Sequence, residues 1–266
     1  MKLHYVLMAA LLAGSPAVAK PAARKAPVAV KSDPAVLKAA CDKLAALVTP
    51  DSAVPQQADK LIGAMLQTML DKDAGFKALN NRYPGMTDAI AQRVQPLMLE
   101  SSRATLPLYR ADLSSLYAAN MTLAEANAAV AFFSSDDGRA LLSSANANID
   151  YKTTVGAITS GGEASTSDLK QDVRSAALQT VAQMTPARKA RVGAFFSSPA
   201  GQKIIAIGPK KAELDRKWFN YAPPGLQDRV ALATVEAMVD HIAKTDPDMA
   251  KKMRDALIEK GVLPKS

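Results

Sequence analysis

Residues 121–142 read MTLAEANAAVAFFSSDDGRALL, and residues 184–205 read MTPARKARVGAFFSSPAGQKII. The two stretches align without a gap, and each residue of the second stands 63 positions after its counterpart in the first. Self-similarity at a fixed offset is typical of a repeated supersecondary unit. The alignment therefore predicts an internal duplication of a helix-turn-helix unit.

The first helix of each unit begins with a recognisable N-terminal cap. Thr122 is followed three residues later by Glu125, which is the pattern of a capping box. Thr185 is followed directly by Pro186, which suits an N-cap and the first helical position. Two different capping patterns thus predict a helix start at the same position of each copy.

The sharp turn inside each unit is predicted from residues that the two copies share. A phenylalanine pair ends the first helix, a serine caps the second helix, and a glycine in its first turn lets the preceding helix approach closely. These residues are Phe132, Phe133, Ser135 and Gly138 in the first copy and Phe195, Phe196, Ser198 and Gly201 in the second. We interpret all of them as structural residues of a corner.

Apolar residues recur every three to four positions along the rest of the chain, without sustained period-two alternation. The sequence predicts an all-α multi-helix bundle of about ten helices. The Gly/Ser/Thr segment 157–167 reads as an exposed linker between a helical lobe at 33–156, with the first copy, and a lobe at 168–261, with the second. Residues 262–266 would form a tail. The chain length allows one large domain or two small ones.

Several helix ends are predicted from local residue types. Asp33 and Pro34 suit the N-cap and first position of a helix. Breaks or kinks are expected at Pro96 and Pro107, because proline removes a backbone donor. After the linker, Ser167 or Asp168 is expected to cap the next helix.

The N-terminus has the pattern of a cleavable secretory signal peptide at residues 1–19. Lys2 precedes a short apolar run, and Ala17 and Ala19 supply the small residues of a cleavage site. The run is shorter than the ~20 residues of a spanning helix, so an uncleaved anchor is disfavoured. Ser15 stands where a lipidated cysteine would be needed, so the protein is expected to be periplasmic or secreted and not a lipoprotein.

The positive charge is concentrated near the N-terminus. The chain carries +8, of which Lys2 contributes one and residues 20–32 contribute four, which leaves +3 for residues 33–266. Residues 20–32 are predicted to be a disordered basic Pro/Ala linker. This tail would either touch an anionic surface or envelope protein or act as a solvated spacer. Nucleic acid is not expected as a partner, because the basic residues are not clustered on a helix with interleaved aromatics and the expected compartment is outside the cytoplasm.

Few residues of the mature chain suggest chemistry. Cys41, the only cysteine, lies on an apolar helix face, which favours a buried thiol over an intermolecular disulfide. His241 is the only histidine after the predicted signal peptide and suits the last turn of a helix. No metal-binding, nucleophile or phosphate-loop motif occurs, so no catalytic residue, metal ligand or cofactor is predicted.

Three further groups have both a functional and a structural interpretation. Asp136 and Asp137 could form the carboxylate pair of a glycosidase, but adjacent residues diverge by about 100° on a helix, which favours a role at the helix N-terminus. Methionine pairs with i, i+4 spacing, Met65 with Met69 and Met249 with Met253, could bind soft metals but are typical of core packing. The aromatic cluster at Trp218, Phe219 and Tyr221 is either a binding patch or a plug at a helix end.

The corner motif resembles a family called domain of unknown function 2059. Residues 184–205 match the family pattern best, and residues 121–142 look like a more divergent copy in which Asp136 and Asp137 replace Pro and Ala. The resemblance implies a small helical domain of exported bacterial proteins and brings no catalytic residues. We therefore expect a non-enzymatic binding or scaffolding protein of the bacterial cell envelope, whose partners include an envelope protein or a second copy of this chain. The alternative is a cell-wall glycan hydrolase that uses paired carboxylates.

Overall fold

The computed structural model describes residues 33–160 and 162–264, in which every regular element is helical. The elements are α1 (Pro34–Val48), the short 3-10 helix η1 (Asp51–Ala53), α2 (Val54–Lys72), α3 (Ala74–Arg82), α4 (Met86–Ala118), α5 (Leu123–Ser134), α6 (Asp136–Asn148), α7 (Lys152–Thr159), α8 (Thr166–Gln183), α9 (Pro186–Ser197), α10 (Pro199–Phe219), α11 (Leu226–Ala243) and α12 (Pro247–Glu259). The prediction of an all-α multi-helix bundle is confirmed. The predicted signal peptide with Ala17 and Ala19, and the basic segment 20–32, lie outside the described residues.

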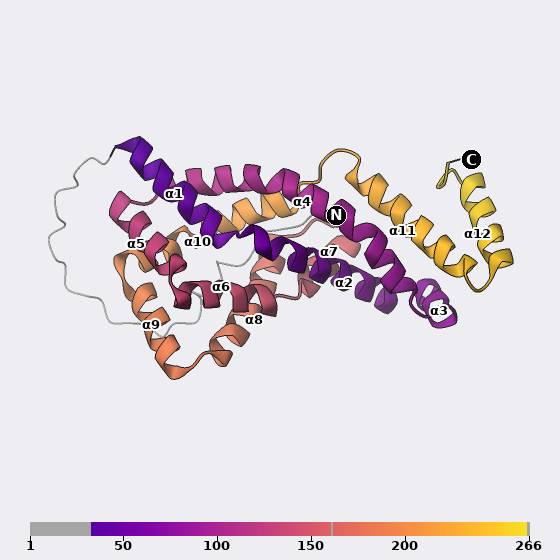
Figure 1. The fold of residues 1–266 in the computed structure, drawn as a ribbon, viewed down its shortest axis with the longest axis horizontal. Helices are drawn as coiled ribbons and strands as arrows, with labels where there is room; N and C mark the ends of the chain where they lie inside the picture. Colours follow the sequence, from indigo (N-terminus) through magenta and orange to yellow (C-terminus); the bar gives the residue numbers. More distant parts are fainter. Residues whose placement is uncertain (1–32, 161, 265–266) are drawn as a thin grey trace.

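The helix α4 links the two ends of an elongated bundle (Figure 1). At one end α4 packs with α1 and α10, and α1 also packs along α5. At the other end α4 packs with α2 and α11, and α12 packs on α11. Two large hydrophobic clusters fill these contacts, and each contains residues from both sides of the segment 157–167. The helices before and after that segment therefore share their hydrophobic cores.

The prolines inside α4 do not end the helix, which corrects the expectation of a break at either of them. Pro96 and Pro107 both lie within the continuous span of α4. An interior proline costs about 3 kcal/mol in an isolated helix. In this bundle α4 buries side chains along its length, among them Ile90, Met98 and Leu113, and that burial outweighs the local cost.

The predicted linker 157–167 is largely ordered by its neighbours. The helix α7 continues through Thr159, and α8 begins at Thr166 with Ser165 as its N-cap, two to three residues earlier than expected. The Ser165 hydroxyl and the Asp168 side chain form a capping box. Ala164 is buried, and Asn220 bonds to both its backbone N–H and its carbonyl. Asn220, which is 56 residues from Ala164 in the sequence, thus holds part of a segment whose composition suggests a loop.

The predicted start of the first helix is confirmed. Asp33 caps α1, and its carboxylate accepts a hydrogen bond from the Ala35 N–H at 2.9 Å. Pro247 occupies the first turn of α12, and Gly261 follows the helix with a φ of 70°, the left-handed conformation that glycine tolerates. No helix in the described part of the chain is long and apolar enough to cross a membrane.

A buried ion pair lies on α10. The Lys211 ammonium lies 2.7 Å from a carboxylate oxygen of Asp215, and the Tyr109 hydroxyl donates a hydrogen bond of 2.6 Å to the same carboxyl group. Asp215 is 1 % exposed. Burial raises the pKa of this carboxyl above its ordinary value, against the opposing effect of Lys211. Because the charges are paired and hydrogen-bonded, the network fits a buried structural role.

Candidate functional site

The two predicted corners have the same local geometry. Ser135 and Ser198 both have extended backbone torsions, and each serine hydroxyl oxygen accepts a hydrogen bond of 3.2 Å from the N–H of the glycine three residues later. The serine N–H donates back to the Phe132 carbonyl in the first corner and to the Phe195 carbonyl in the second. The serine caps predicted from the sequence are confirmed.

The corner glycines allow a close approach between the two helices of each unit. A Cβ atom on Gly138 would lie 2.1 Å from the Phe132 carbonyl oxygen, and one on Gly201 would lie 2.2 Å from the Phe195 carbonyl oxygen. Both distances are far below van der Waals contact. The backbone of the preceding helix therefore occupies the space where any other residue would carry its side chain, as the sequence predicts.

The four corner phenylalanines pack together, so that the two corners contact one another. The rings of Phe132 and Phe195 are stacked with their centroids 3.8 Å apart, and Phe133 meets Phe195 edge to face at 5.6 Å. Phe196 completes the cluster against Phe132. Phe133 is fully buried, whereas its counterpart Phe196 is partly exposed. The corners thus serve as a packing unit.

Asp136 and Asp137 do not form a convergent carboxylate pair. Asp136 is exposed at the start of α6, whereas Asp137 makes ion pairs with Arg191 at 2.5 Å and Arg188 at 3.1 Å on α9. Hydrogen bonding to Arg191, together with Arg188, lowers the pKa of Asp137 to about 2. This carboxylate links the first unit to the second.

The other candidate residues named from the sequence are buried, hydrogen-bonded or packed against the hydrophobic clusters. Cys41 is fully buried, and burial raises the pKa of its thiol. His241 lies in the last turn of α11, and its Nε2 atom is 3.0 Å from the Pro84 carbonyl oxygen. The indole N–H of Trp218 donates to Asp112, and its ring packs against the core while Tyr221 remains exposed. Met65 and Met69 belong to one hydrophobic cluster, and Met249 and Met253 pack against another.

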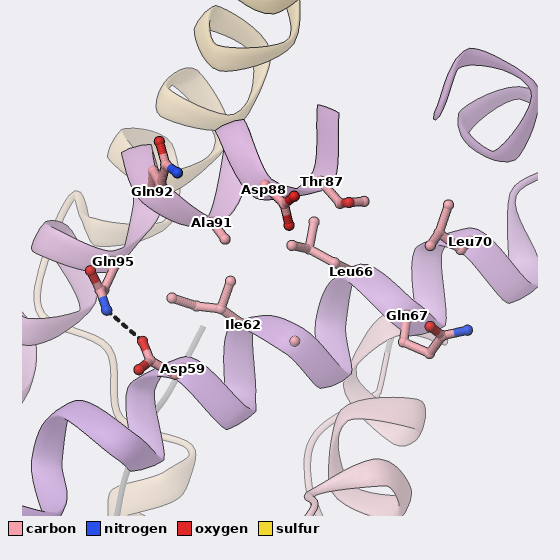
Figure 2. A pocket seen from close by; sticks show the side chains of 11 residues that line it. Asp59, Ile62, Leu66, Gln67, Leu70, Thr87, Asp88, Ala91, Gln92 and Gln95 are labelled. Atoms are coloured by element: carbon pink, nitrogen blue, oxygen red, sulfur yellow. Dashed lines mark hydrogen bonds between the residues drawn. The ribbon is translucent and has the colours of Figure 1, made fainter. Parts of the chain in front are cut away.

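One candidate site is a groove between α2 and α4, which we call the α2–α4 groove. It has a volume of about 370 Å³. Its lining comprises Asp59, Ile62, Gly63, Leu66, Gln67 and Leu70 from α2, and Thr87, Asp88, Ala91, Gln92 and Gln95 from α4. Figure 2 shows Ile62 and Leu66 directed toward the helix that carries Ala91.

The spacing of these residues follows from helix geometry. On α2 the lining positions recur every three or four residues, and so do those on α4, which places each set on one helix face. The apolar members Ile62 and Leu66 are buried and form the floor. The Gln95 amide donates a hydrogen bond of 2.5 Å to Asp59 and connects the two helices at one end of the groove.

The polar lining of the α2–α4 groove consists of acceptors and amides. Asp59, Asp88, Gln67 and Gln92 are exposed at its sides, and no lysine or arginine is among the lining residues. Carboxylates accept hydrogen bonds, and side-chain amides both donate and accept. Together with the apolar floor, this arrangement suits a ligand that offers N–H or cationic groups and some apolar surface.

None of these residues was predicted from the sequence to form a site. Asp59 lies on α2, whereas Asp88 and Gln92 lie on α4, and α3 separates these two helices in the sequence. Each residue therefore looks like part of an ordinary solvated helix face, because the groove exists only where α2 and α4 lie side by side. Apolar residues at helical spacing, such as Leu66, indicate a buried helix face but do not indicate a neighbouring groove.

Comparisons with protein-family models, with curated proteins and with solved structures found no match to this chain.

Proposed function

We propose that this chain is an exported, non-enzymatic binding protein of the bacterial cell envelope, and that the α2–α4 groove holds an extended segment of a polypeptide partner. The export signal and the resemblance to domain of unknown function 2059 support the compartment. The observation that carries the binding role is the groove itself, in which carboxylates and amides line the sides above a buried apolar floor.

The hydrogen-bonding capacity of the groove favours a peptide. Gln67 and Gln92 can each pair with both the N–H and the carbonyl of a peptide backbone. Ile62 and Leu66 offer an apolar surface for alternate side chains of the bound segment. Recognition by backbone hydrogen bonds with apolar contacts is a common mode of peptide binding.

The charge of the groove favours a neutral or basic segment. Asp59 and Asp88 are the charged lining residues, so an acidic segment would be repelled. Because both carboxylates stand at exposed positions, each is expected to change partner affinity by only a few-fold, in line with about 0.2–1 kcal/mol for an exposed ion pair.

Site-specific photo-crosslinking in the native envelope tests this proposal. A photoreactive residue at Gln92 is expected to form adducts with a polypeptide, whereas the same residue at Gln179, exposed on α8, is not. Asp88→Asn should reduce adduct formation. Asp248→Asn is the matched control, because Asp248 also lies in the first turn of a helix but outside the groove.

The outcomes separate the candidate functions. Equal labelling from Gln92 and Gln179, or labelling insensitive to Asp88→Asn, would exclude the α2–α4 groove as the binding site. An adduct with the mass of two copies of this chain would identify the partner as the protein itself, which is the proposed homo-oligomer.

A cell-wall glycan hydrolase remains the second candidate, because Asp59 and Asp88 line the same groove. Glycosidases use two carboxylates on either side of the scissile bond, separated by about 5–10 Å. If this function holds, purified cell wall will release soluble glycan fragments on incubation with the protein, and an Asp59→Asn, Asp88→Asn double variant will release none. Absence of release by the unaltered protein would eliminate it.

A further inference from the structure

A second groove lies between α1 and α6 and has a different chemical character. This α1–α6 groove has a volume of about 550 Å³, within the range of about 300–1,000 Å³ that is typical of small-molecule sites. Its lining residues are Lys43, Ala46, Leu47, Pro50, Ser52, Ala53, Gln56, Phe133, Arg139, Leu142, Ser143 and Asn146. None of them lines the α2–α4 groove.

The floor of the α1–α6 groove is apolar. Phe133 is fully buried, Leu142 is 5 % exposed, and Leu47 is partly buried against the same cluster. Ala46 is exposed at the groove and leaves room above the floor. An aliphatic chain in this space would gain about fourfold in affinity for each methylene removed from water.

The charges at the groove are all positive. Lys43 from α1 and Arg139 from α6 are among the lining residues, and no aspartate or glutamate is. Within the described residues no ion pair involves Lys43 or Arg139. Other basic residues of the same region are neutralised: Lys38 pairs with Asp42, and Arg110 pairs with Asp51.

The orientation of Arg139 is held by the first corner. Its Nε–H donates a hydrogen bond of 2.9 Å to the Ser134 carbonyl, which fixes the guanidinium stem at the start of α6. The second corner has Gln202 at the equivalent position, and its amide donates to the Phe196 carbonyl at 2.7 Å. A local hydrogen bond is therefore kept in both copies, whereas the positive charge is present only in the copy that borders the groove.

We propose that the α1–α6 groove binds a single-chain amphiphile with an anionic head group, such as a fatty-acid carboxylate. The aliphatic chain lies over Phe133 and Leu142, and the head group is held by Lys43 and Arg139. Charge complementarity selects an anion over a neutral or cationic amphiphile of the same length. This ligand site is independent of the partner-binding role of the α2–α4 groove.

Calorimetric titration of the purified protein with three ten-carbon probes tests the proposal. Decanoate, decanol and decyltrimethylammonium share one aliphatic chain and differ in head-group charge. Decanoate is expected to bind with the highest affinity. If decanol binds as tightly as decanoate, or the cationic probe binds more tightly, the assignment of Lys43 and Arg139 as head-group ligands is overturned.

Two variants locate the site. The double variant Lys43→Gln, Arg139→Gln should weaken decanoate binding about tenfold, since two exposed charge contacts are lost, and leave decanol binding unchanged. It should fold, because the second corner already accepts glutamine at the position of Arg139. The matched control Lys77→Gln, Arg103→Gln removes the same charges from exposed positions outside the groove and should bind like the unaltered protein.

Filling the groove provides the second test. Ala46→Phe places an aromatic ring over the floor and should reduce decanoate and decanol binding together. Far-ultraviolet circular dichroism checks that the helical content is retained. Wild-type decanoate affinity in either the charge variant or a folded Ala46→Phe protein would refute the site.

Discussion

The glycine in the corner of the second unit offers a sharp test of the packing argument. Replacing Gly201 with alanine adds one methyl group, which would lie 2.2 Å from the Phe195 carbonyl oxygen and 2.5 Å from the Phe196 Cα. Both neighbours are backbone atoms at the end of α9, so no side-chain rotation relieves the contact. The two helices must move apart by about 1 Å or more, as carbon atoms pack at ~3.5–4.0 Å.

Opening the corner has a cost that can be estimated from its contacts. The Ser198 cap bond to the Gly201 N–H is weakened, and loss of an N-cap costs about 1 kcal/mol. Overpacking of a close contact costs about 1–3 kcal/mol. Against this, alanine is favoured over glycine inside a helix by about 1 kcal/mol. We expect Gly201→Ala to lower the free energy of unfolding by about 1–3 kcal/mol.

Guanidinium chloride unfolding followed by circular dichroism measures this change. Gly193→Ala is the matched control, because Gly193 lies in the same unit, in the helix α9, and a Cβ there would meet nothing within 4 Å. That control should stabilise the protein by about 0.5–1 kcal/mol. The opposite signs of the two alanine substitutions are the decisive result. If Gly201→Ala is as stable as the unaltered protein, the close approach does not set the residue choice.

Three further experiments test the electrostatics and the contact between corners. Asp215→Ala should destabilise the protein by about 3–5 kcal/mol in denaturant unfolding, because the charge of Lys211 loses its buried counterion. Adding Lys211→Met to that variant should recover part of the lost stability. No recovery would contradict the pairing of the two residues. Asp137→Asn should lower the melting temperature near neutral pH. The pKa of Asp137 in the folded protein lies below the value of about 3.9 for an unfolded aspartate, so this carboxylate stabilises the protein only while it is ionised. The difference in melting temperature from the unaltered protein should therefore vanish as the pH falls from about 4 to about 2. A double-mutant cycle of Phe132→Ala and Phe195→Ala should show a coupling free energy of about 0.5–1.5 kcal/mol, and a coupling near zero would mean that the stacked rings do not hold the corners together.

The local features of the fold were predictable because each depends on residues within six positions of one another. The capping box of Thr122 and Glu125 and the caps at Ser135 and Ser198 are hydrogen bonds within a single helical turn. The corner glycines follow the same logic, because the backbone they contact ends only a few residues earlier. The continuity of α4 was missed, since packing along the whole helix overrides the local effect of Pro96.

The candidate grooves could not be predicted from the sequence. Asp59 and Asp88 look like solvated surface residues until α2 and α4 lie side by side. Lys43 of α1 and Arg139 of α6 line one groove only once the helices are assembled. Nor did the shared corner pattern reveal that Phe133 becomes fully buried while Phe196 stays partly exposed. That asymmetry arises from α1, which packs along α5.

The sequence by itself determined the helical class, most helix ends and the two corners, because caps, turns and amphipathic periodicity are set by short-range bonds and steric limits. Only the tertiary structure decided that Asp137 of the first unit pairs with Arg188 and Arg191 of the second, and that the phenylalanine pairs stack on each other. Such contacts depend on how every helix buries its apolar face at once. No short stretch of sequence contains that information.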